Sequence, residues 1–82
     1  MNLKWIKCDD THLEAYLGKW HVITLIKEGK FWKWYSELPF STTKYNGRRF
    51  GKDTSPKRAA LEAQRSTEEW LQAAGLVQTA QE

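Results

Sequence analysis

Residues 20–35 read WHVITLIKEGKFWKWY, and this stretch predicts two β-strands joined by a tight turn. β-Branched and aromatic side chains dominate both halves, a composition that is typical of strands. Glu28 and Gly29 interrupt the pattern with residues that favour a turn. We therefore expect an antiparallel hairpin with strands over residues 20–27 and 30–36.

Shorter strand candidates precede this hairpin. Residues 3–8 alternate apolar and polar side chains, and the polar residues 9–11 then predict a turn. Residues 12–17 also alternate, a pattern that fits either a strand or a single helical turn. Gly18 and Lys19 suit a two-residue hairpin loop of type II′, because glycine at the first central position tolerates a positive φ.

The second half of the chain carries the signals of one long helix. Ser55 is a favourable N-cap, Pro56 fits the first helical position, and Gly75 is placed to end the helix. Small and apolar residues recur between these ends at helical spacing and form one stripe, which we expect to pack against the sheet. The stripe consists of Ala60, Ala63, Thr67, Trp70, Leu71 and Ala74.

Residues 37–53 form a long connection between the strands and this helix. We expect it either to be a functional loop or to hold a further short strand, for which residues 48–51 are the candidate. Together the elements predict an α+β fold, a small antiparallel β-meander of three or four strands packed on one C-terminal α-helix. Residues 1–76 are expected to form a single domain and residues 77–82 a flexible tail. Exposed strand edges make either a monomer or an edge-paired homodimer the expected state.

Length and composition exclude several classes of protein. The chain has 82 residues, which is enough for one small domain, and its single cysteine, Cys8, excludes an intramolecular disulfide. The N-terminal sequence lacks the apolar run of a signal peptide, and no stretch of the sequence reaches the length of an apolar membrane span. We therefore expect a cytoplasmic protein without a membrane partner.

Candidate metal and catalytic residues are few. Cys8 and His12 are four residues apart, with Asp9 and Asp10 between them and His21 further along. A zinc site needs three or four ligands in a suitable geometry, and this spacing, without a second cysteine pair, does not supply them. Nothing at a recognisable spacing orients a cysteine–histidine pair for nucleophilic catalysis. We predict no metal site, no cofactor and no catalytic residue, and therefore that the protein is not an enzyme.

Positive charge is concentrated in one segment of the chain. Residues 44–58 contain six basic residues and one acidic residue and carry +5, while the rest of the chain carries −2. Lysine and arginine neutralise backbone phosphates, and unpaired bases stack on aromatic rings, so this mixture predicts contact with DNA or RNA. The simpler interpretation is a solvated basic loop. The expected nucleic-acid-binding residues are Lys44, Arg48, Arg49, Lys52, Lys57 and Arg58, with Tyr45 or Phe50 as a stacking ring.

The aromatic strand supports a second interpretation. Most of its rings are expected in the core, because a small domain depends on large side chains for buried area. If Trp32, Trp34 and Tyr35 instead share an exposed sheet face, they form a surface for a protein partner, since tryptophan and tyrosine are enriched at binding hot spots.

Two segments carry resemblances to known groups of proteins. The first is carried by Trp20, Val22, Gly29, Lys30, Phe31, Trp32, Trp34, Gly47, Gly51, Thr54, Ala59 and Ala60. This arrangement, over about residues 20–74, resembles short phage and prophage proteins that combine a Trp-rich hairpin, a Gly-containing loop and an Ala-rich helix. The resemblance implies a mobile-element origin without an assigned activity. For the aromatic surface, the resemblance implies that the protein binds and inhibits a host protein, such as a nuclease or an RNA-guided defence complex.

The second resemblance concerns residues 51–60, GKDTSPKRAA. They are similar to the point in double-stranded-RNA-binding domains where the last strand ends in a glycine and a basic run opens an Ala-rich helix. By this resemblance Lys57, Arg58 and Lys52 would contact phosphates, although Pro56 interrupts the basic run. In topology alone, strands followed by one helix are similar to the arm-site DNA-binding domains of tyrosine recombinases, whose sheet enters the major groove.

Overall fold

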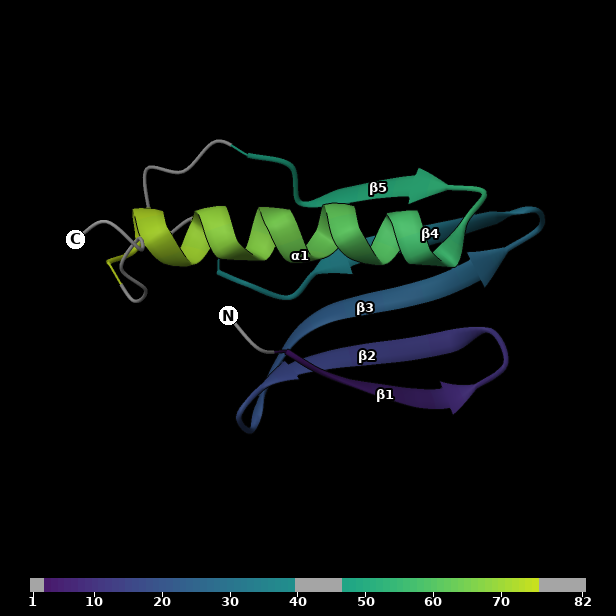
Figure 1. The fold of residues 1–82 in the computed structure, drawn as a ribbon, viewed down its shortest axis with the longest axis horizontal. Helices are drawn as coiled ribbons and strands as arrows, with labels where there is room; N and C mark the ends of the chain where they lie inside the picture. Colours follow the sequence, from purple (N-terminus) through teal and green to yellow (C-terminus); the bar gives the residue numbers. More distant parts are fainter. Residues whose placement is uncertain (1–2, 40–46, 76–82) are drawn as a thin grey trace.

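The chain forms an antiparallel sheet with one helix packed across it (Figure 1). The computed structural model describes residues 3–39 and 47–75. Within these ranges the elements are β1 (Lys4–Asp9), β2 (His12–Leu17), β3 (Trp20–Glu28), β4 (Phe31–Ser36), β5 (Phe50–Asp53) and α1 (Pro56–Ala73). The order of strands in the sheet is their order in the chain, and each neighbouring pair is antiparallel. The predicted α+β meander with one C-terminal helix is confirmed.

The described part of the sheet has five strands, one more than the largest number expected. Residues 12–17 form a strand, which decides between the two alternatives for this segment. The long connection does hold a further strand, but it spans Phe50–Asp53 instead of residues 48–51 and pairs with β4. The expected tail, residues 77–82, and the expected domain end at residue 76 lie outside the described residues.

Two glycines close the tight turns on either side of β3. Leu17 pairs with Trp20 across the first turn, and Gly18 has a φ of +63°, as a type II′ turn requires. The second turn has Gly29 at its first central position, with a φ of +61°. It lies one residue later than predicted, because β3 continues to Glu28.

Both ends of the helix follow the signals in the sequence. Ser55 is the N-cap, and its hydroxyl accepts a hydrogen bond of 3.3 Å from the backbone N–H of Arg58. Pro56 is the first helical residue, where its missing N–H leaves no bond unmade. At the other end Gly75 has a φ of +75° and donates its N–H to the carbonyl oxygen of Gln72.

The core lies between the helix and one face of the sheet, over β3, β4 and β5 (Figure 1). Ala59 and Ala63 are fully buried, and their small side chains let the helix lie close to the strands. The buried stripe therefore includes Ala59, while Ala60, which the sequence placed on it, is half-buried. The buried apolar residues are Ala15, Val22, Ile23, Leu25, Trp34, Leu38, Ala59, Ala63, Trp70 and Leu71.

The opposite face of the sheet is covered by no helix or strand of the described residues, and we call it the open face. Side chains alternate between the two faces along each strand. In β4, Trp32 and Trp34 lie on the helix side, and Phe31, Lys33 and Tyr35 lie on the open face. Among the described residues no helix combines the length and the apolar character needed to span a membrane.

Candidate nucleic-acid interface

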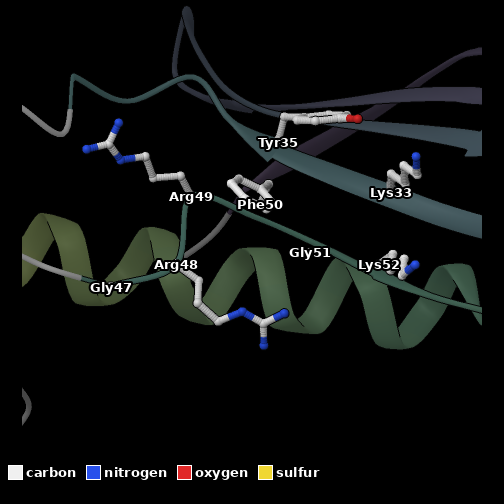
Figure 2. A pocket seen from close by; sticks show the side chains of 8 residues that line it. All are labelled: Lys33, Tyr35, Gly47, Arg48, Arg49, Phe50, Gly51 and Lys52. Carbon is white, nitrogen blue, oxygen red and sulfur yellow. The ribbon is translucent and has the colours of Figure 1, made fainter.

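An open hollow of about 810 Å³ lies along β4, β5 and the residues that lead into β5 (Figure 2). It exists because β5 adds a short outer strand whose register places Lys52 opposite Lys33 and Phe50 opposite Tyr35. No carboxylate is present among the described residues that line it. The lining residues are Lys33, Tyr35, Gly47, Arg48, Arg49, Phe50, Gly51 and Lys52.

Two aromatic rings of this hollow are open to solvent. Phe50 is 67% exposed and Tyr35 is 37% exposed, and Figure 2 shows the two side chains near each other at the sheet surface. Most of the Phe50 side chain therefore lies outside the core. The pair offers ring faces on which a flat apolar group can stack.

Lysine side chains flank these rings on the open face. The Lys52 Nζ lies 4.7 Å from the centroid of the Phe31 ring, a cation–π contact that keeps the ammonium group on this face. The Lys33 Nζ lies 2.7 Å from Glu28 Oε1, and this hydrogen bond raises the pKa of Lys33. The Lys33 ammonium is thus paired with Glu28, and the Lys52 ammonium lies against the Phe31 ring.

The segment before β5 is held from two sides. The backbone N–H of Ser36 donates to the carbonyl oxygen of Arg49 at 2.7 Å, and the hydroxyl of Ser66 on α1 donates to the carbonyl oxygen of Arg48. These bonds tie residue 49 to β4 and residue 48 to the helix. The hollow is consequently built on fixed backbone.

The two arginines of this segment point in different directions (Figure 2). The Arg48 side chain lies over α1, with its Nη1 3.5 Å from Glu62 Oε1 and its guanidinium 6.0 Å from the Trp34 ring. Trp34 Nε1 donates to the same Glu62 oxygen at 3.5 Å. Arg48 is therefore engaged on the helix side. The Arg49 side chain extends outward from the rim of the hollow, away from the Arg48 guanidinium.

Arg58 is engaged by an internal carboxylate. Its Nε and Nη2 each lie 3.0 Å from Asp53 Oδ1, which also accepts a hydrogen bond of 2.9 Å from the backbone N–H of Ser55. Asp53 thus links the end of β5 to the first turn of the helix. Arg58 does not line the hollow, so it lies apart from the surface that Lys52 shares with the exposed rings.

The predicted cations that the structure describes do not all lie on one surface. Arg48, Arg49 and Lys52 line the hollow, Arg48 is also paired with Glu62, and Arg58 is paired with Asp53 away from it. Lys57 is exposed in the first helical turn and does not line the hollow. The predicted residues Lys44 and Tyr45 lie outside the described residues.

The alternative aromatic surface is corrected in one respect. Trp34 is 1% exposed in the core, and Trp32 is half-buried against it, so these rings do not form an exposed face. Tyr35 points to the other side of the sheet and joins Phe50. Alternation along the strand, which the sequence already predicts, separates Tyr35 from Trp32 and Trp34, and the helix covers the face that carries the two tryptophans.

Lys33 and Tyr35 belong to the hollow although the sequence analysis did not include them in a nucleic-acid site. The signal was present in the alternation of residues 31, 33 and 35, which places them on one face of β4. What the sequence did not contain was the register of β5 against β4. That register alone brings Lys33 beside Lys52.

The Asp53 contacts predict how stability responds to acid. The N–H of Ser55 and then the Arg58 guanidinium hold the pKa of Asp53 below its ordinary value. A carboxyl with a lowered folded-state pKa stabilises the fold above its unfolded value of about 3.9, and this stabilisation is lost as pH falls toward the folded-state pKa. We expect Asp53→Asn to be less stable than wild type at pH 7, with the difference shrinking below about pH 4.

Urea unfolding followed by far-UV circular dichroism across this pH range measures the difference. If the curves of wild type and Asp53→Asn stay parallel from neutral to acid pH, the ionised Asp53 does not stabilise the junction between β5 and α1.

No protein-family model, curated protein or solved structure matches this chain. The site is therefore described by its own geometry. It is a fixed, open hollow with two exposed rings, two strand lysines and one arginine at its rim.

Proposed function

We propose that the protein binds nucleic acid through the open face of β4 and β5. The binding surface consists of Lys33, Tyr35, Arg49, Phe50 and Lys52, and we call it the ring–cation surface. The observation that carries the proposal is the exposure of Phe50 and Tyr35 directly beside strand lysines in a hollow whose described lining contains no carboxylate.

The chemistry of this surface fits a single strand. Every base has a π-face, so unpaired bases stack on exposed rings while cations nearby contact the backbone phosphates. In a duplex the base faces are hidden, and only phosphates and groove edges can be reached. Because exposed rings distinguish this surface from an ordinary basic patch, single-stranded DNA or RNA is the favoured ligand.

Double-stranded ligands provide the comparison. The resemblance to double-stranded-RNA-binding domains depended on cations that open the helix, and Arg58 there is paired with Asp53. A sheet that enters the major groove would use the same open face as a single strand. Measuring a single strand and a duplex of the same sequence separates these modes.

Fluorescence anisotropy with a short labelled oligonucleotide tests the proposal. If Lys33, Arg49 and Lys52 neutralise about three phosphates, the logarithm of affinity should fall against the logarithm of salt with a slope of about −2 for a single strand. Affinity should then drop about 20-fold between 50 and 200 mM salt. Absence of binding at 50 mM, or binding that does not respond to salt, contradicts the proposal.

The protein-partner alternative now depends on Tyr35 alone among its three rings, because Trp34 is buried and Trp32 is half-buried. A host protein recovered from lysate after nuclease treatment, in the absence of oligonucleotide binding, would favour this alternative. The proposed nucleic-acid function predicts that nuclease treatment removes what the protein recovers.

A further inference from the structure

A second group of chemically active side chains lies on the open face at the other side of the sheet. Cys8 comes from β1, and His12 and Glu14 come from β2. The Cys8 sulfur, one His12 ring nitrogen and one Glu14 carboxylate oxygen all lie within 4.8 Å of one another. Along the strand pairing, Glu14 lies opposite Thr24 and Thr24 opposite Tyr35, so this group is separated from the ring–cation surface by β3.

Strand geometry explains why these three residues meet. His12 and Glu14 are two residues apart in β2, so their side chains leave the same face. The pairing of β1 with β2 shifts register between Lys7 and Asp9, which leaves Cys8 at a bulge. A bulge redirects a side chain and is common beside functional sites.

One polar atom of this group has no hydrogen-bond partner in the part of the chain that the structure describes. The His12 Nε2 atom is shielded from solvent and, within the described residues, has no partner in hydrogen-bond geometry, although it lies 3.2 Å from Glu14 Oε2. With the ring proton on Nδ1, the His12 Nε2 and the Glu14 Oε2 both present lone pairs at this distance. A cation between them would satisfy both.

The Glu14 carboxylate is already oriented to bind a cation together with His12. The Tyr16 hydroxyl donates to Glu14 Oε1 at 2.8 Å, which leaves Oε2 directed toward His12. Ligating carboxylates are commonly held by an outer hydrogen bond of this kind.

We propose that Cys8, His12 and Glu14 bind a transition-metal ion, with Zn²⁺ as the best fit. Sulfur, imidazole nitrogen and carboxylate oxygen are the three ligand types that Zn²⁺ takes in proteins. Ligand atoms around one tetrahedral Zn²⁺ lie about 3.3–3.8 Å apart, given bonds of about 2.0–2.3 Å. Small side-chain rotations would shorten the observed separations, which reach 4.8 Å, to these values. Three protein ligands leave a fourth position for water or another ligand.

The prediction of no metal site is revised by this arrangement. The sequence analysis considered Cys8 with His12 and the two aspartates between them, and did not weigh Glu14. Spacing along the chain counted Cys8 and His12, whereas alternation along β2 places Glu14 beside His12 and the β1–β2 pairing brings Cys8 to both. The proposed metal would join the edge strand β1 to β2.

The test uses the full chain without an affinity tag and titrates it with Zn²⁺ against a chromophoric chelator. Wild type should bind one ion per chain. Cys8→Ser and His12→Gln should each weaken binding at least about tenfold, since loss of even an outer-shell partner commonly costs about 10–100-fold. Asp10→Asn is the matched control. Asp10 is an exposed carboxylate that pairs with Lys7 and is not part of the cluster, so this change should leave affinity unaltered.

Two further measurements distinguish a specific metal site from nonspecific binding of the ion. Co²⁺ in place of Zn²⁺ should give a thiolate-to-metal charge-transfer band that Cys8→Ser abolishes. Zn²⁺ should raise the melting temperature of wild type and not of Cys8→Ser, whose exposed side chain is replaceable without loss of the fold. The proposal is overturned if no stoichiometric binding occurs, if the two ligand variants bind as wild type does, or if the cobalt band is missing.

Discussion

Trp34→Ala is expected to destabilise the fold by about 3–5 kcal/mol, the cost of removing a large buried ring and leaving a cavity. Trp34 is 1% exposed and is the largest of the fully buried side chains. Native domains have a total stability of about 5–15 kcal/mol, so this loss removes most of the stability of a domain at the lower end of that range.

The position of Gly51 explains why this ring is so closely packed. Gly51 pairs with Trp34 across β4 and β5, and a Cβ built on it would lie 2.5 Å from Trp34 Nε1. The indole is thus enclosed by β5 on one side and meets the Glu62 carboxylate at 3.5 Å on the helix. No neighbouring side chain can fill the space that Trp34→Ala would open.

Urea unfolding measured by circular dichroism checks this prediction, with Trp20→Ala as the control. Trp20 is 39% exposed and contacts Trp70 edge to face at a centroid distance of 6.2 Å. Trp20→Ala should lower the free energy of unfolding by clearly less than Trp34→Ala does. Equal midpoints for the two variants would show that Trp34 is not a core residue and would return it to the set of exposed rings.

The sequence predicted those parts of the fold that depend on local chemistry. The hairpin of β3 and β4, the II′ turn at Gly18 and both helix ends follow from residues that are adjacent along the chain. β5 could be placed only approximately, because four residues carry little pattern and their strand identity depends on pairing with β4.

The candidate site depended on contacts that the sequence does not display. Arg48 and Arg49 are adjacent along the chain, yet Arg48 reaches Glu62 on the helix and Arg49 lies at the hollow. Local charge counting predicted that the segment is basic, and the fold determined which of its cations share a surface. Strand alternation separates Trp34 from Tyr35, because adjacent strand residues leave opposite faces of the sheet.

The most direct test of the account is the affinity of Phe50→Ala for a single-stranded oligonucleotide at low salt. Stacking of a base on an aromatic side chain contributes about 1–3 kcal/mol, so the dissociation constant should rise about 5- to 150-fold. The fold should be unaffected, because the ring is 67% exposed and surface substitutions change stability by about 0.5 kcal/mol or less.

Leu61→Ala is the matched control. Leu61 is 59% exposed on α1, so this change removes a similarly exposed apolar side chain away from the ring–cation surface. The account predicts that Phe50→Ala loses most of the binding while Leu61→Ala binds as wild type does. Equal affinities for Phe50→Ala, Leu61→Ala and wild type would contradict binding at the open face of β4 and β5.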